Sequence, residues 1–94
     1  MTITIRQAGP DDAAAVLALV TALAVYEKEA DKVKMTEGGA RDVLAGGRLH
    51  ALLGFAGDEA VAIALYFFNF SSWTGKRGLF LEDLFVAPDL RGQG

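Results

Sequence analysis

The 94 residues are enough for one small domain, and a content of 52% hydrophobic and 22% charged residues is typical of a folded globular chain. The net charge of −3 and pI near 4.9 argue against nucleic-acid binding, which requires a basic face, and favour cationic partners. Without cysteine the chain has no disulfide and no thiolate nucleophile, which is compatible with the cytoplasm, and a single histidine leaves no plausible zinc site.

The beginning of the chain predicts a strand followed by a helix. Residues 2–6 alternate polar and apolar side chains, as in a half-buried strand. Gly9-Pro10-Asp11-Asp12 then begins a helix, because proline suits the first turn and aspartates complement its positive end. Apolar side chains recur at helical spacing and give this helix one core-facing side: Val16, Leu19, Val20, Leu23 and Tyr26.

The apolar run over residues 13–26 is interpreted as a buried helix. It is too short to cross a bilayer, and the two aspartates before it have the wrong charge for a signal peptide. We therefore expect no membrane partner. A mixed-charge segment follows from Glu27 to Lys34, and Thr36 is a suitable N-cap for a second, short helix through Leu44.

Three strands are predicted in the second half. Residues 49–55 and 60–70 form two of them, joined by a hairpin turn at Gly57-Asp58. Residues 69–78 are expected to form a loop, and residues 79–86 the last strand. The order β-α-α-β-β-β predicts an α/β fold, in which two helices flank an antiparallel sheet of four strands.

Two adjacent carboxylates, Glu82 and Asp83, interrupt the apolar strand at 79–86. Because side chains alternate along a strand, we expect them on opposite faces of the sheet. A buried carboxylate must be paired, hydrogen-bonded or protonated, so this placement indicates either a catalytic role or a structural one. In the structural interpretation, one carboxylate forms a salt bridge with Arg77 or Lys76 and the other reaches water at a sheet edge.

The segment Arg91-Gly92-Gln93-Gly94 closely follows this strand. It offers a cation and two glycines whose bare backbone can approach a phosphate closely, and a following helix would add its positive end. The same pattern also occurs in ordinary surface turns. It is neither a Walker loop nor a Gly-x-Gly-x-x-Gly dinucleotide motif.

Residues 85–94 resemble the coenzyme A signature of the GNAT superfamily of N-acetyltransferases, Arg/Gln-x-x-Gly-x-Gly/Ala, whose last two positions fall beyond Gly94. Other segments resemble one branch of it, the diamine (spermidine/spermine) and thialysine acetyltransferases, in the same order: Leu23–Glu27, Thr36-Glu37, Trp73-x-Gly75-Lys76 and Leu81–Val86. The resemblance covers nearly the whole chain. It implies the N-terminal half of a GNAT fold, with residues 1–94 forming one partial domain that ends within the pyrophosphate loop.

The resemblance also implies an activity and a site. The activity is transfer of acetyl from acetyl-CoA to a primary amine of a small cationic molecule, a polyamine or a lysine- or thialysine-like compound. The acetyl-pantetheine arm would meet the backbone of Leu84, Phe85 and Val86. The pyrophosphate would be held by Arg91, Gly92, Gln93 and Gly94. Glu82 matches the acidic residue that accepts a proton from the attacking amine through water, while the positions near the amine substrate are Tyr26, Glu27, Trp73 and Asp83.

Several of these residues also have a structural interpretation. Tyr26 can be a core aromatic residue, Glu27 a solvated charge at a helix end, and Trp73 a cover over the sheet edge. His50 is expected at the start of a strand, without a catalytic role. Ser71 replaces an acidic residue of the family two places before the tryptophan, which predicts an acceptor smaller or less charged than spermine.

The alternative to an enzyme is a non-catalytic half-domain that dimerises and binds CoA weakly or not at all. A chain this small buries limited surface, and the strand at 79–86 lacks the neighbour that the family places beside it. Both considerations predict a homodimer.

Overall fold

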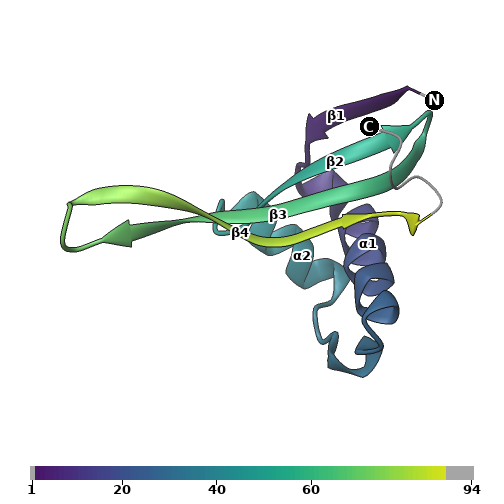
Figure 1. Cartoon of the computed structure of the whole chain (residues 1–94), viewed down its shortest axis with the longest axis horizontal. Coiled ribbons are helices and arrows are strands. Elements are labelled where there is room, and N and C mark those ends of the chain that lie inside the picture. Colours follow the sequence, from purple (N-terminus) through teal and green to yellow (C-terminus); the bar gives the residue numbers. More distant parts are fainter. Residues whose placement is uncertain (1, 89–94) are drawn as a thin grey trace.

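The computed structural model describes residues 2–88 of the chain. Its elements are β1 (Ile3–Gln7), α1 (Ala13–Tyr26), α2 (Glu37–Ala45), β2 (His50–Ala56), β3 (Glu59–Ser71) and β4 (Lys76–Val86), with single 3-10 turns at Pro10–Asp12 and Ala30–Lys32 (Figure 1). The strands form one antiparallel sheet in the order β1-β2-β3-β4. The α/β fold expected from the sequence is therefore confirmed.

The turn between β2 and β3 is the two-residue hairpin that the sequence predicts. Ala56 ends β2 and Glu59 begins β3, which leaves Gly57-Asp58 between them. Gly57 has a φ of +63°, a conformation that glycine adopts without the steric cost of a Cβ. This turn sets the pairs beside it, Ala56 with Glu59 and Phe55 with Ala60, before the register shifts by one residue at Gly54.

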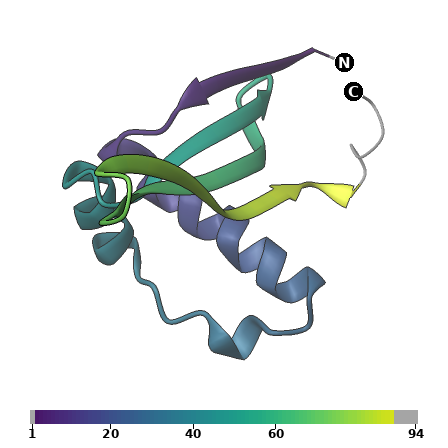
Figure 2. The ribbon, with the colours of Figure 1, turned by 60° about the vertical axis from the view of Figure 1, so that its left-hand side comes forward.

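Both helices pack on the same face of the sheet, as two views of the ribbon show (Figures 1 and 2). Between helices and sheet lies one apolar core, formed by Val16, Leu19, Ala51, Leu53, Ile63, Leu65 and Phe85. Tyr26, expected on the core-facing side of α1, is 55% exposed at the end of that helix. Within residues 2–88, no helix has the length and apolar character needed to span a bilayer.

The β3–β4 connection differs from the prediction of a loop over residues 69–78. The two strands continue to Ser71 and from Lys76, and the turn has only four residues. Cross-strand contacts outweigh the polar and glycine signals of the sequence: the rings of Phe67 and Phe80 lie 5.1 Å apart, and the Arg77 guanidinium lies 4.8 Å from the ring centroid of Phe68. The hairpin therefore extends well beyond the helices (Figure 1).

The apolar composition of residues 79–86 is typical of a buried strand, but β4 is buried on one face only. In the sheet that residues 2–88 form, β4 is an edge strand, and the helices cover only one face. Phe85, on the helix side, is 3% exposed, whereas Leu79 and Leu84 are 62% and 63% exposed. The apolar composition of β4 thus reflects an open surface as well as the core.

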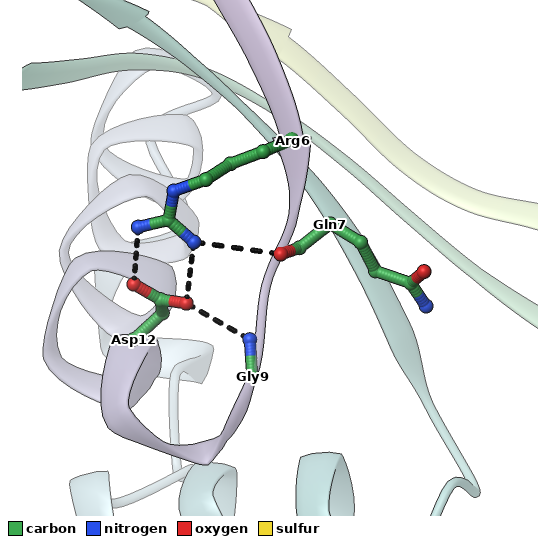
Figure 3. Close-up of polar contacts among 4 residues, drawn as sticks. All are labelled: Arg6, Gln7, Gly9 and Asp12. Atoms are coloured by element: carbon green, nitrogen blue, oxygen red, sulfur yellow. Dashed lines mark hydrogen bonds and ion pairs between the residues drawn. The ribbon is translucent and has the colours of Figure 1, made fainter.

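An ion pair joins β1 to the start of α1 (Figure 3). Arg6 Nη2 lies 2.8 Å from Asp12 Oδ1 and Arg6 Nη1 2.9 Å from Oδ2, a bidentate arrangement. Asp12 Oδ2 also accepts a hydrogen bond from the Gly9 N–H at 2.8 Å. The bonds from Arg6, helped by that from Gly9, lower the pKa of the Asp12 carboxyl from 3.8 to about 2, against the opposing effect of its partial burial.

Replacing Asp12 by asparagine tests this connection. Because the folded-state pKa of Asp12 is depressed, its stabilisation is present above about pH 4 and is lost as the pH falls towards about 2. We expect Asp12→Asn to lower the free energy of unfolding by about 1 kcal/mol at neutral pH, a value reduced by solvent screening around the half-exposed Arg6. Urea unfolding at several pH values measures the difference, which should shrink below about pH 4 and vanish only below about pH 2, where the carboxyl is protonated in the folded state as well. Asp11→Asn is the matched control, and equal losses in both variants would contradict the assignment.

Candidate functional site

The register between β3 and β4 shifts by one residue at Glu82. Leu65 pairs with Asp83, but the next residue of β3, Tyr66, pairs with Leu81. Glu82 is therefore an extra residue in β4, which is a β-bulge. Bulges re-aim side chains, and here both Glu82 and Asp83 line one pocket. The prediction that the two carboxylates lie on opposite faces was wrong, because it assumed an unbroken strand.

This pocket, called the acidic pocket below, has a volume of about 330 Å³. It lies between the bulge of β4, the C-terminal half of α1 and the segment that links α1 to α2. Leu23, Leu49 and Leu65 supply apolar lining. The charged residues that line it are Glu27, Glu29, Lys32, Lys34, Glu82 and Asp83.

The charges of the acidic pocket are unevenly matched. Lys32 Nζ and Glu29 Oε1 lie 2.9 Å apart and neutralise each other. Glu82 is exposed and Asp83 half-buried, and among the described residues neither forms the salt bridge with Arg77 or Lys76 that the structural interpretation required. The pocket is left with an excess of negative charge. Residues 2–88 contain no group of three or more side chains suited to hold a metal ion.

The structure brings together three of the residues expected at the site, Glu27, Glu82 and Asp83. Tyr26 and Trp73 are not among the residues that line the acidic pocket. The ring centroid of Tyr26 lies 6.4 Å from that of Phe85, while Trp73 is 96% exposed in the β3–β4 turn. The structural interpretation, in which Trp73 covers the sheet edge, is therefore wrong.

Ser71 and His50 both make contacts that have a structural role. Ser71, which replaces an acidic residue of the family, uses its Oγ to accept hydrogen bonds from the Trp73 and Thr74 N–H groups, both at 3.2 Å. It stabilises the hairpin turn. His50 begins β2, as expected, and stacks on Tyr66 with ring centroids 5.2 Å apart.

The residues expected to meet acetyl-CoA begin directly after the bulge. Leu84, Phe85 and Val86 end β4, and the Ala87 N–H donates to the Val61 carbonyl at 2.8 Å, which continues the strand pairing. Phe85 anchors this end in the core. The expected pyrophosphate residues, Arg91, Gly92, Gln93 and Gly94, lie outside the described residues.

Sequence reasoning missed the contribution of residues 29–34 to the pocket, because it described them only as part of a mixed-charge segment. Lys34 lines the acidic pocket, and its neighbours Val33 and Met35 are half-buried and line it too. The alternation of apolar, charged and apolar residues at 33–35 was the available signal, because it is typical of an extended segment lying on a surface.

Among known proteins, the chain is similar to acetyltransferases. No family model matches the chain. A thialysine N-epsilon-acetyltransferase of Sus scrofa is 36% identical over 103 residues, which span 99% of this chain and 60% of the relative. Among solved structures, an aminoglycoside acetyltransferase from an uncultured soil metagenomic sample aligns with a TM-score of 0.85 at 18% identity, covering 100% of this chain and 64% of that one.

This chain has the GNAT acetyltransferase fold. A predicted acetyltransferase with acetyl-CoA from Clostridium acetobutylicum has the same fold, with a TM-score of 0.80 at 18% identity over 99% of this chain and 65% of that one. The resemblance to the thialysine branch of the GNAT acetyltransferases, inferred from short segments, is confirmed along nearly the whole chain. The chain spans about 60% of the length of the curated relatives that it matches.

Proposed function

We propose that the protein transfers the acetyl group of acetyl-CoA to a primary amine of a small cationic molecule, a polyamine or a lysine- or thialysine-like compound. The observation that carries this proposal is the bulge in β4. It places Glu82 and Asp83 in one pocket with Glu27, directly before Leu84–Val86, the strand end that the GNAT resemblance assigns to the coenzyme.

The acidic pocket suits an amine acceptor. Its excess of carboxylates attracts an ammonium group, but a lysine-like amine is unprotonated in only about one molecule in a few thousand at neutral pH. A nucleophilic attack therefore requires a proton acceptor beside the amine. Glu82 lines the pocket and is exposed, so it can accept this proton directly or through one water.

The end of β4 suits the donor. Leu84–Val86 is an apolar segment that starts next to the acceptor pocket, and it would lie along the acetyl-pantetheine arm. When bound, acetyl-CoA supplies the electrophilic thioester carbonyl. In the balanced reaction an amide C–N bond forms, the C–S bond breaks, and one proton passes from the amine to the leaving sulfur. Backbone N–H groups of β4 could stabilise the developing oxyanion.

A non-catalytic half-domain is the second candidate, and the exposed apolar surface of the β3–β4 hairpin favours it. Phe70 and Leu79 are 67% and 62% exposed, and Trp73 is 96% exposed. Exposed apolar residues gathered on one hairpin favour an interaction surface. The same surface supports the proposal of a homodimer, whether or not the protein is an enzyme.

The role of Glu82 is tested by Glu82→Gln in the acetyl-transfer assay. We expect the turnover number to fall by about a hundredfold to ten-thousandfold, the usual contribution of a general base, with acetyl-CoA affinity unchanged. Asp83→Asn should mainly raise the KM for the amine, because Asp83 only attracts the ammonium. Glu59→Gln, an exposed carboxylate at the start of β3, is the control. An unchanged rate and pH profile in Glu82→Gln would assign the carboxylate a structural role.

The coenzyme loop is tested by Gly94→Val. A side chain at this glycine should keep the backbone from approaching the pyrophosphate, so calorimetry should detect a large loss of CoA affinity. Gly38→Ala is the control, because a Cβ at Gly38 meets no atom within 4 Å. Unchanged CoA affinity in Gly94→Val would rule out this binding mode, and absence of CoA binding in the wild type would favour the non-catalytic candidate.

Light scattering tests the homodimer. We expect the mass of a dimer at micromolar concentration, and a monomer after Phe70 and Trp73 are both changed to serine, since these changes remove apolar area from the hairpin surface. Ile5→Ser is the matched control, because Ile5 is 68% exposed on β1 at the other edge of the sheet. A stably folded wild-type monomer would defeat the proposal.

A further inference from the structure

Helix α1 ends at a residue with an unusual backbone conformation. Lys28 has a φ of +61°, and within residues 2–88 it is the one residue other than glycine with a positive φ. This left-handed region is unfavourable for a residue with a Cβ, because the Cβ comes close to the following carbonyl oxygen. Lys28 therefore adopts a conformation that its own side chain disfavours, and the surrounding structure must hold it there.

Two backbone hydrogen bonds hold this conformation. The Glu29 N–H donates to the Ala24 carbonyl at 2.7 Å, and the Lys28 N–H donates to the Val25 carbonyl at 3.0 Å. With Glu27 as the C-cap, this pair of bonds is the Schellman motif, in which the residue after the C-cap is usually glycine. Here lysine occupies that position. The motif ends α1 and reverses the chain, which then returns along the helix towards α2 (Figure 2).

The reversal determines where one wall of the acidic pocket lies. Glu27 and Glu29, the residues on either side of Lys28, both line the pocket, whereas Lys28 does not. The same wall continues through residues 32–35. The wall that faces it is the bulge of β4 at Glu82. The conformation of Lys28 thus sets the position of the first wall relative to the second.

We propose that Lys28 is a positioning residue for the amine acceptor, and that it acts through its backbone conformation and not through its charge. This inference rests on the proposed function and adds to it a residue that does not itself meet the substrate. In any other conformation of residue 28, the chain would leave α1 in a different direction and Glu29 would leave the wall. The acceptor would then lose negative charge on this side, while Glu82 would keep its place on β4.

Four variants separate conformation from charge. Lys28→Gly and Lys28→Asn tolerate the left-handed region, Lys28→Met keeps the Cβ and removes only the charge, and Lys28→Val adds a β-branch that disfavours this region further. In urea unfolding we expect Lys28→Gly to raise the folding equilibrium constant by about fivefold. Lys28→Met should leave this constant nearly unchanged, and Lys28→Val should lower it. No gain in stability in Lys28→Gly would overturn the inference.

Kinetics with 1,5-diaminopentane, whose charged groups are both amines, tests the positioning role. Lys28→Val should raise the KM for this probe by about twofold to fivefold, the factor that one exposed charge pairing gives. Its kcat should be unchanged, because Glu82 comes from β4. The other three variants should keep the wild-type KM. An unchanged KM in Lys28→Val would leave Lys28 a structural role only, and an equal rise in Lys28→Met would assign the effect to charge; either result overturns the inference.

NMR titration with the same probe separates this inference from the proposed function, because it needs no acetyl transfer. In the wild-type protein, the amide resonances of Glu27 and Glu29 should shift and saturate together, and Lys28→Val should bind the probe more weakly. This result without any acetylation would support the inference and overturn the proposed function alone. Turnover that depends on Glu82, with Glu27 and Glu29 unshifted, would overturn the inference alone. Absence of both binding and turnover would overturn both.

Discussion

One extra residue in β4, Glu82, determines which carboxylates line the acidic pocket. With regular pairing along the whole strand, Glu82 and Asp83 would face opposite sides of the sheet, and only one could reach the pocket beside α1. The bulge at Glu82 removes this alternation locally, so both carboxylates line the acidic pocket. The proposed proton acceptor and the proposed ammonium site then come from consecutive residues, directly before the segment that would meet the coenzyme.

The bulge is held in place by packing on both sides. On the C-terminal side, Phe85 is buried in the core and pairs with Ile63. On the N-terminal side, the paired rings of Phe67 and Phe80 fix the register of the hairpin. A slip of one residue in the pairing of β3 and β4 would move these side chains to the opposite face of the sheet. Because one face is buried, such a slip is unfavourable and the register is well defined. The carboxylates themselves need little compensation, because the pocket is open to water.

The sequence predicted the order and type of the elements because their local signals are strong. The Gly57-Asp58 turn and the apolar periodicity of α1 are examples. It did not predict the long β3–β4 hairpin, since Asn69, Gly75 and Gly78 favour a loop, and only cross-strand contacts such as Phe67–Phe80 show that the strands continue. The bulge and the exposure of β4 were missed for the same reason: both depend on which residue lies opposite which, and that is set by tertiary pairing. The residues of the connecting segment that line the pocket were missed because a mixed-charge segment is usually solvated.

The central claim is that the bulge turns both carboxylates to one amine site, and carbon-13 NMR of the side-chain carboxyl groups tests it most directly. Glu82→Gln and Asp83→Asn identify the two resonances, and the wild-type protein is titrated with lysine. Both resonances should shift together and saturate at the same ligand concentration, because both groups meet the same bound molecule. A response from Asp83 alone, with Glu82 unmoved throughout the titration, would contradict the account and return Glu82 to the opposite face of the strand.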